Sequence, residues 1–564
     1  MLFYDFEVFK YDWLVVIKDT DTQTTHTIVN DRDKLIKLYE ANRRNIWVGY
    51  NSKHYDQYIL KGLILGFNPK EVSDYIIELG NSGWKYSHLM SKVVLYNYDC
   101  MVNPLYSLKQ LEGFMGNDIR ETTVPFNIQR KLNEQELQEV IFYCNHDVEQ
   151  TMEVFINTYS EFESIMSLIT AFDMPLKNIA NTKPQLSAMI LEARQKKHDD
   201  EFDLTIVDTL RLDKYKHIEK WYRDKNNLNY ESKLKIDVMG VPHIFAWGGL
   251  HGAVTNYVGE GFFVNSDVGS YYPALMIEYD FLSRNVKNKD KFREIRDKRL
   301  IYKHEGNPLQ QPYKIVLNST YGASKDKNNP LYDPRQANNV CVNGQLLLLD
   351  LIEHVETQLR GAKLIQSNTD GVMFKLRSKE DLPKYLEICE EWSKRSRMDL
   401  EHDYIKKVVQ KDVNNYLVVM EDGKVKSKGA YVKKLSALDY DLPIVNKAVK
   451  DYLIEGTPID ETILSCTDLK EFQKIVKVSS KFRFASHNGE QLDGKVFRVF
   501  ASRSLNDGTI YKHKVGYTTK VGNTPEKCFV MNEDINGVEI PRKLNKNWYI
   551  EIAKKRVADF MGVA

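Results

Sequence analysis

Two acidic residues interrupt an apolar stretch, LFYDFEVF, near the start of this 564-residue chain. Asp5 and Glu7 are two positions apart, and side chains alternate along a β-strand, so both should leave the same face of a sheet. Their mutual repulsion is unfavourable unless water or a cation compensates it. The stretch therefore predicts a strand with a pair of carboxylates on one face.

The first 160 residues alternate strand-like and helix-like stretches. LFYDFEVF and DWLVVIKD predict paired strands, followed by a helix over 31–43, the strand NIWVGYN and a helix from about residue 54. NEQELQEVIFYCNHDVEQTMEVFINTYSEF is typical of a long amphipathic helical region. Together these patterns predict an α/β domain of ordinary size.

Length and charge limit the remaining choices. The length predicts roughly three to five domains. The net charge of +1 gives no general affinity for polyanions, so any nucleic-acid surface must come from local segregation of charge. The six cysteines form no CxxC pair, which favours reduced thiols in a cytoplasmic protein. No signal peptide and no membrane span is expected.

A first set of acids extends beyond this strand. Asp56 follows in GYNSKHYD, and Asp147 comes four residues after Tyr143, on the same face of the predicted helix. Four acids and a tyrosine can bind two divalent cations and orient a water for attack on a phosphate. A solvated surface carboxylate is the commoner reading of any one of these acids alone.

The ordered set and its context resemble the proofreading 3′–5′ exonucleases, which have an Asp-Glu-Asp-Asp site, a final Tyr-x-x-x-Asp motif and an RNase-H-like fold. The resemblance implies four catalytic metal ligands: Asp5, Glu7, Asp56 and Asp147. It makes Tyr143 the residue that positions the water, with Asn51 near the second motif. YSLKQL resembles the family's Ser/Thr-Leu element, which implies that Ser107 and Leu108 hold the single-stranded 3′ end. The family's auxiliary lysine has no evident counterpart.

A second set of motifs begins with FFVNSDVGSYYPALM. Asp267 ends an apolar strand, and after a turn Pro273 is expected to open a helix. PYKIVLNSTYG is helix-like, with Gly322 where a C-cap is expected. One face of this helix carries only polar residues: Lys314, Asn318 and Tyr321. An amphipathic helix with a merely solvated face does not explain that selection.

The third motif of this set, LIQSNTDGVMF, reads as two short strands around a polar turn. Asp370 at its tip is well placed to hold a metal ion, whereas Asn368 is an amide where a second acid would be expected. In their order, the three motifs resemble those of family B DNA polymerases. With the exonuclease, the likeness covers the chain to about residue 435 and implies a multidomain α/β and α+β protein with palm, short fingers and thumb.

The resemblance assigns the polymerase chemistry. In the family's Asp-Thr-Asp-Ser pattern the second aspartate is the principal metal ligand, here Asp370, while Asn368 and Gly371 replace the first aspartate and the serine. Asp267, Asp370 and the Val268 carbonyl hold Mg²⁺, with Mn²⁺ as an alternative and two ions per active site. A working site with altered metal demand is expected.

The same resemblance assigns the nucleotide contacts. Lys314 contacts the incoming deoxynucleoside triphosphate and can protonate the leaving pyrophosphate, while Asn318 and Tyr321 border the nascent base pair. Tyr272 crowds a ribose 2′-hydroxyl and so selects deoxynucleotides. Three basic residues at helical spacing are candidates to steady the phosphates, with a solvated basic face as the equal alternative: Arg296, Arg299 and Lys303.

Two stretches are candidate contacts for primer–template DNA. FAWGGLHGA resembles the family's Tyr-x-Gly-Gly linker, with Gly248 and Gly249 matching and Ala246 in the tyrosine position. After the hairpin, a lysine-rich stretch suggests a phosphate track, although lysine is missing from the family's Lys-x-Tyr element. The residues predicted to contact DNA there are Tyr416, Lys428 and Tyr431.

Lys314 follows Asp267 by only 47 positions, which leaves room for two short finger helices. Protein-primed bacteriophage polymerases resemble this chain in size but carry insertions between these motifs. The resemblance therefore favours a compact bacteriophage or plasmid replicase that extends an ordinary primer. It would act in the cytoplasm of a bacterial host, with single-strand-binding or other replication proteins. Two alternatives remain: an exonuclease whose polymerase site is weak because of Asn368, and a non-catalytic DNA-binding factor. The expected domains are exonuclease 1–165, connecting region 166–255, palm 256–285 and 323–440, fingers 286–322 and thumb 441–564.

Overall fold

The computed structural model describes residues 1–563, which form two compact units. The first unit contains residues 1–181, 435–445 and 463–550, and the second contains the rest of the described chain. Three helices have residues in both units: α14 (Pro443–Glu455), α15 (Ile459–Ser465) and α16 (Lys546–Met561). None of the helices in this described part combines the length and the apolar character needed to cross a bilayer.

A five-stranded sheet forms the base of the first unit. Its order is β3-β2-β1-β4-β5, and β1 pairs antiparallel with β2 and parallel with β4. The strands predicted at β1, β2 and β4 are confirmed, whereas β3 and β5 were not expected. The strands are β1 Leu2–Val8, β2 Trp13–Asp19, β3 Thr24–Val29, β4 Ile46–Gly49 and β5 Tyr96–Asp99.

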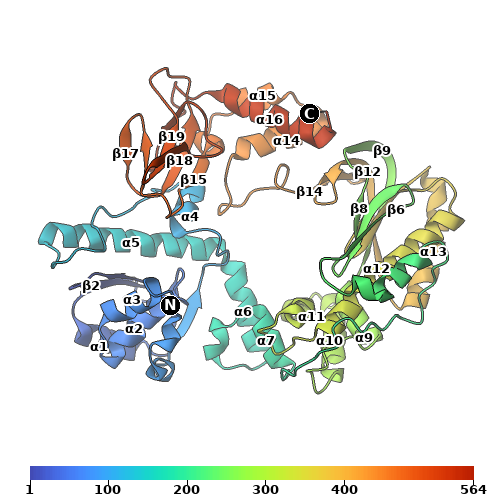
Figure 1. Ribbon diagram of the computed structural model, residues 1–564, viewed down its shortest axis with the longest axis horizontal. Helices are drawn as coiled ribbons and strands as arrows, with labels where there is room; N and C mark the ends of the chain where they lie inside the picture. The colour runs from blue at the N-terminus through green and yellow to red at the C-terminus, as the bar shows by residue number, and fades with distance from the viewer. Residues whose placement is uncertain (564) are drawn as a thin grey trace. The chain divides into compact units, whose positions relative to one another are not determined.

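Helices cover both faces of this sheet (Figure 1). Even-numbered side chains of β1, such as Tyr4, join the core under α1 (Arg32–Ala41) and α2 (Asp56–Leu65). Odd-numbered ones, such as Phe3, join the core under the 24-residue α5 (Glu134–Asn157). Alternation therefore directs Asp5 and Glu7 towards α5. The other helices here are α3 Pro69–Ile77, α4 Leu108–Met115 and α6 Tyr159–Ala171.

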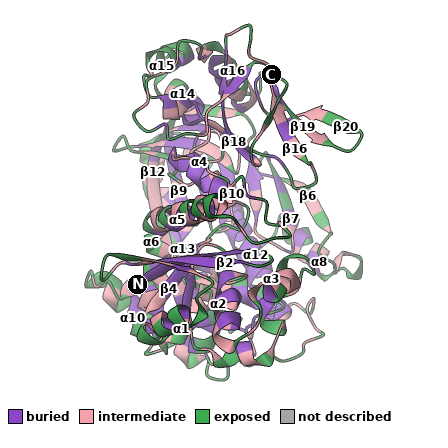
Figure 2. Ribbon diagram, turned by 90° about the vertical axis from the view of Figure 1, so that its left-hand side faces the viewer, coloured by how far each residue is buried: buried purple, intermediate pink, exposed green. Residues whose placement is uncertain are grey.

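The C-terminal part of the first unit consists of two small sheets. The central strand of the three-stranded sheet, β18 (Val496–Ala501), is buried along its whole length (Figure 2). Arg498 on β18 is fully buried and donates to the carbonyl oxygens of Gly113 at 3.2 Å and Asn117 at 2.6 Å, which ties this sheet to the end of α4. The sheets contain β15 Lys474–Lys477, β18 Val496–Ala501 and β21 Cys528–Val530, and β17 Glu490–Leu492, β16 Phe484–His487, β19 Ile510–Lys514 and β20 Tyr517–Lys520.

A nine-stranded sheet organises the second unit, in the order β14-β13-β12-β9-β11-β10-β8-β7-β6. The long strands β9 and β12 pair over most of their length, and β11 lies on the other side of β9. The strands are β6 Lys233–Val238, β7 Val241–Ala246, β8 His251–Ala253, β9 Tyr257–Val268, β10 Lys363–Asn368, β11 Gly371–Leu376, β12 Leu400–Asp412, β13 Asn415–Met420 and β14 Val425–Lys428.

Among the helices of the second unit, α12 (Pro334–Gln358) is buried along most of its 25 residues. Two details differ from expectation. Pro273 is the third residue of its helix and Gly322 lies inside its helix, because both helices extend further than the apolar pattern indicated. The remaining helices are α7 Lys183–Ile190, α8 Lys216–Arg223, α9 Tyr271–Glu278, α10 Asp290–His304, α11 Gln310–Lys325 and α13 Leu382–Ser396.

Candidate active sites

The first carboxylate set gathers between β1 and α5. Asp5 and Glu7 project from β1, and their carboxylate oxygens lie within 4.8 Å of each other and of the Cys144 sulfur. Tyr143 and Asp147 come from α5, four residues apart as predicted, and Asp147 is 7% exposed. The strand period of two puts Asp5 and Glu7 on the face that α5 covers, and the helix spacing of four puts Tyr143 and Asp147 on one face of α5.

The loop before α2 supplies the fourth acid. Asp56 is the first residue of α2, and its carboxylate accepts the backbone N–H of Phe6 at 3.1 Å. Asn51 has a positive φ of 58° and donates its backbone N–H to Asp99, a carboxylate that the sequence reasoning missed. Asp99 also accepts the backbone N–H of Lys53 at 3.0 Å. It therefore fixes the loop that presents Asp56.

Burial and mutual repulsion dominate the electrostatics of this set. Desolvation, followed by repulsion from neighbouring carboxylates, raises the pKa of Asp5 and Glu7 well above the usual range. Desolvation likewise raises the pKa of Asp56 to about 7 and that of Asp147 to about 6. Because all four carboxyl groups have raised pKa values, a bound cation would stabilise their ionised forms. Hard oxygen donors of this kind suit Mg²⁺ or Mn²⁺.

These shifts predict a pH-dependent response to metal. Since the native state holds protons that the unfolded chain releases near pH 4, the metal-free protein should lose stability as pH rises from 5 to 8, by on the order of 3 kcal/mol. Mg²⁺ should therefore raise the melting temperature more at pH 8 than at pH 5. Thermal melts with EDTA or Mg²⁺ measure this, and an equal Mg²⁺ shift at both pH values would contradict it.

A lysine that the sequence reasoning did not single out reaches the same set. Lys109 on α4 is 8% exposed, and its Nζ lies 2.5 Å from Asp147 and 3.0 Å from the fully buried Glu112. It also stands 4.6 Å from the centre of the Tyr143 ring. Although burial opposes it, attraction to the two carboxylates raises the pKa of Lys109. Lys109 thus supplies a fixed positive charge beside Asp147.

Replacing Lys109 with methionine should leave two buried carboxylates without a counter-charge. We expect the free energy of unfolding to fall by about 3 kcal/mol, with partial recovery on adding Mg²⁺. Urea unfolding of the variant measures the loss. Lys34→Met, at an exposed position on α1, is the matched control and should change stability by less than about 0.5 kcal/mol.

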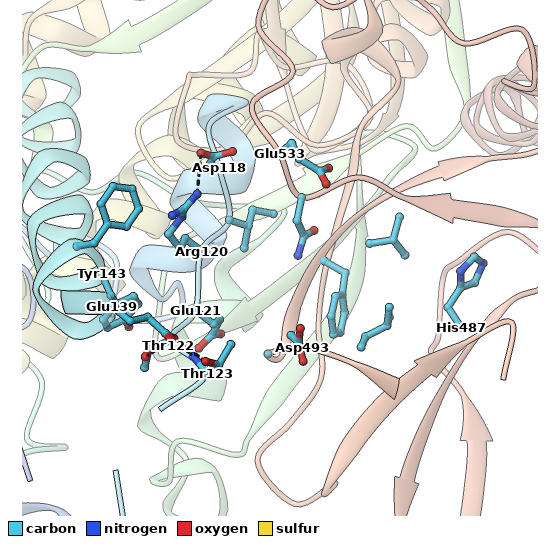
Figure 3. Close-up of a pocket in the computed structure, with 17 residues that line it drawn as sticks. Asp118, Arg120, Glu121, Thr122, Thr123, Glu139, Tyr143, His487, Asp493 and Glu533 are labelled. Atoms are coloured by element: carbon cyan, nitrogen blue, oxygen red, sulfur yellow. Dashed lines mark hydrogen bonds and ion pairs between the residues drawn. The ribbon is translucent and has the colours of Figure 1, made fainter. Parts of the chain in front are cut away.

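A cavity of about 830 Å³ lies beside Tyr143 within the first unit (Figure 3). Residues 118–123 and α5 line one side, and His487 and Asp493 from the C-terminal sheets line the other. Arg120 packs over the exposed Phe142 ring at 4.6 Å. Acidic residues outnumber basic ones in the lining, so this cavity disfavours a phosphate chain: the acids are Asp118, Glu121, Glu139, Asp493 and Glu533.

The second carboxylate set lies where β9 and β11 meet. Gly371 at the start of β11 pairs with Asp267, and the backbone N–H of Val268 donates to the carbonyl oxygen of Asp370 at 2.7 Å. Desolvation and then repulsion by Asp370 raise the pKa of Asp267 to about 6. Desolvation also raises the pKa of Asp370. Asp267 on β9 and Asp370 in the turn before β11, two acids predicted from separate motifs, are therefore neighbours.

Asn368 takes a structural position in this turn. Its side-chain oxygen accepts the backbone N–H of the next residue, Thr369, at 3.0 Å, a local contact at the start of the turn. On the adjacent strand it pairs with His251. The amide thus stabilises the turn that presents Asp370 without adding a third negative charge.

The Asp267 carboxylate occupies the space that a side chain at Gly371 would need. A Cβ at Gly371 would lie 1.8 Å from an Asp267 carboxylate oxygen, whose other oxygen accepts the Asn265 side-chain N–H at 2.7 Å. Gly371→Ala should therefore displace this carboxylate and lower any metal-dependent synthesis by about 100-fold. Steady-state primer extension measures this. Gly522→Ala, where a Cβ meets open space, is the control and should keep the wild-type rate.

The residues expected to contact a nucleotide lie on α9, α10 and α11. Lys314 and Asn318 are exposed on α11, and the Tyr321 ring packs on Tyr272 with 4.2 Å between centroids. The three basic residues of α10 predicted to contact phosphates already have partners in this structure. Arg296 bonds Glu278 at 3.1 Å, Arg299 donates to the Ser270 hydroxyl at 2.8 Å, and Lys303 pairs with Glu401 at 3.5 Å.

Most residues expected to contact DNA lie in or near the large sheet, and two lie at the start of α4 in the first unit. Gly249 packs beside the turn, because a Cβ there would lie 2.8 Å from the Thr369 hydroxyl, whereas Gly248 faces open space. Tyr416 pairs with Lys428 across β13 and β14. Tyr431 lies under two cations, with Lys411 Nζ 5.5 Å and the Arg556 guanidinium 4.9 Å from its ring centre. Ser107 caps α4 just before Leu108.

Three curated proteins that this chain resembles over part of its length are DNA polymerases. It is 28% identical over 233 residues to DNA polymerase 1 of Sulfurisphaera ohwakuensis, a match that covers 41% of this chain and 25% of the relative. Part of the chain is therefore similar to DNA polymerases. DNA polymerase 1 of Saccharolobus solfataricus is 29% identical over 202 residues, covering 35% of this chain and 21% of the relative.

The matches thus span about a quarter of the length of these curated relatives, all of which are archaeal. No protein-family model matches the chain. Among solved structures, the family B DNA polymerase from Pyrobaculum calidifontis aligns with a TM-score of 0.46 at 13% identity, covering 100% of this chain and 78% of that one.

Proposed function

We propose that this protein is a family B DNA polymerase that extends a primer 3′ end on a DNA template and carries a 3′–5′ proofreading exonuclease. The observation that carries the proposal is the pairing of β9 with β11, which sets Asp267 beside Asp370 in a chain similar to DNA polymerases. A second, separate carboxylate set around Asp5 supports the nuclease activity.

Divalent metal fits both sets of donors, since each gathers desolvated carboxylates with raised pKa. Asp5, Glu7, Asp56 and Asp147 would hold it in the exonuclease. Asp267, Asp370 and the Val268 carbonyl would hold it in the polymerase. Bound Mg²⁺ or Mn²⁺ would supply positive charge that stabilises the negative charge on the attacking and leaving oxygens of phosphoryl transfer.

The chain's own residues would then orient the substrates. Lys314, exposed and one helical turn from Asn318, would contact the triphosphate of the incoming deoxynucleotide. The Tyr272 and Tyr321 rings would form a wall against the sugar and the nascent base pair. In the exonuclease, the raised pKa of Tyr143 keeps its phenol neutral, so that its hydroxyl can donate to a water or a phosphate oxygen.

The domain interpretation follows the same proposal. The five-stranded sheet with α5 corresponds to an RNase-H-like exonuclease, the nine-stranded sheet to a palm, and α10 with α11 to short fingers. The C-terminal sheets would be the thumb, although they group with the first unit. A bacteriophage origin and a bacterial host stay predictions, to which the archaeal relatives lend no support.

Primer extension tests the proposal. A labelled primer–template is incubated with the protein and Mg²⁺, with and without deoxynucleotides. We expect elongation when they are present and 3′ shortening when they are absent. Shortening under both conditions would instead favour an exonuclease with an inactive polymerase site, an alternative motivated by the neutral Asn368 beside Asp370. Binding of DNA without any turnover would refute both activities.

A further inference from the structure

A second pocket lies on the first unit, apart from both carboxylate sets. Its volume is about 600 Å³, within the range of pockets that hold small ligands. It is formed by α2 and by two short 3₁₀ turns, Gly83–Lys85 and His88–Lys92. The side chains that matter to the argument are Tyr58, Lys61, Trp84, Lys85 and His88.

Two aromatic rings shape this pocket. Trp84 is 60% exposed, unusual for so large an apolar side chain. The Tyr58 ring lies against the backbone of Gly83, where a Cβ would come within 2.4 Å of the ring. Only glycine therefore lets the turn approach α2 closely enough to set Trp84 beside the pocket. The indole offers a flat surface on which no other aromatic ring of the described chain stacks.

The charge of the pocket is positive. No carboxylate lines it. Among the described residues, Lys61 Nζ donates to the amide oxygen of Gln57 at 3.2 Å, and no carboxylate forms an ion pair with Lys85. Each lysine instead lies by a ring, Lys61 5.6 Å from the centre of Tyr58 and Lys85 5.3 Å from that of Trp84. Two unpaired lysines contrast with the acidic cavity beside Tyr143.

We propose that this pocket binds single-stranded DNA, with a base stacked on Trp84 and the flanking phosphates contacted by Lys61 and Lys85. Aromatic rings interleaved with cations are how proteins bind single strands without reading their sequence. In a duplex the bases stack on one another, so no base is free to stack on the Trp84 indole. The proposal rests on the proposed function only for the choice of DNA as ligand, because the polymerase and the exonuclease both handle an unpaired strand.

Binding can be measured apart from catalysis. Fluorescence anisotropy with a labelled thymidine oligomer of about 12 nucleotides, a length that one single-strand module covers, is run in EDTA so that no cleavage occurs. Trp84→Ala should weaken binding about tenfold, and Trp84→Phe should recover part of the loss. For Lys61→Ala with Lys85→Ala, the slope of log affinity against log salt should fall by about 1.4. Quenching of the wild-type tryptophan emission by the oligomer should decrease in Trp84→Phe.

The matched control is Lys34→Ala with Lys37→Ala, which removes the same charge from an exposed face of α1 in the same unit. Its affinity should stay within about twofold of the wild type. If the Trp84 and lysine variants bind like this control, the pocket is not the site. A Trp84→Ala defect that is equally large with a duplex of the same length would show that the site does not take unpaired bases. Failure of primer extension would leave this binding result unchanged, so the two proposals fail separately.

Discussion

Replacing Asp370 with asparagine is expected to lower primer extension at least about 1,000-fold while leaving 3′ shortening intact. Asp370 is the acid at the tip of the β10–β11 turn, and an amide keeps its size but loses the negative charge that a divalent cation requires. Because Asn368 already contributes no charge, no neighbouring residue of the turn can replace it. Single-turnover extension with Mg²⁺ measures the loss.

The matched control for this variant is Asp422→Asn. Asp422 also occupies a hairpin turn of the same sheet, between β13 and β14, but it is exposed and pairs with Lys424 at 2.8 Å. Its replacement should leave extension within about twofold of the wild type. Asn368→Asp is the informative third variant. If it extends a primer faster than the wild type, the natural amide limits the metal site, and if not, the amide serves the turn.

The sequence predicted the parts of the fold that depend on local periodicity. The two-residue spacing of Asp5 and Glu7 predicted a shared face, and the four-residue spacing of Tyr143 and Asp147 predicted a shared helix face. Both patterns are properties of a single element, so they can be read without knowing the neighbours. The Asp370 turn was recognisable for the same reason.

Contacts between segments that are distant in the sequence could not be predicted from local patterns. Lys109 appeared in it only as a neighbour of Leu108, because its partner Asp147 lies 38 positions away on another helix. Arg498 reaches the carbonyl of Gly113 across 385 positions, and no periodicity announces a buried arginine that bonds backbone oxygens. Asp99 was missed because it accepts only backbone N–H groups of a loop. Lys109 contacts the site acid Asp147, Asp99 fixes the loop before Asp56, and Arg498 fixes the end of α4.

The largest effect on the first unit should come from Asp5→Asn combined with Glu7→Gln. We expect 3′ shortening to fall at least about 1,000-fold, since two of the four acids that would bind metal lose their charge. Extension should persist, because Asp267 and Asp370 lie in the other unit. Asp33→Asn with Glu40→Gln, which neutralises two acids on the exposed side of α1, is the control and should shorten primers normally.

Measuring the stability of this variant separates two interpretations, because its melting temperature should rise while its 3′ shortening activity falls. Asp5 and Glu7 are buried among like charges that raise their pKa, so neutral replacements relieve repulsion and should raise the melting temperature in EDTA at pH 8. The stabilisation that Mg²⁺ gives the wild type should shrink at the same time. A variant that loses shortening and also melts earlier in EDTA would mean that these acids hold the fold together, and the metal-site interpretation would then be wrong.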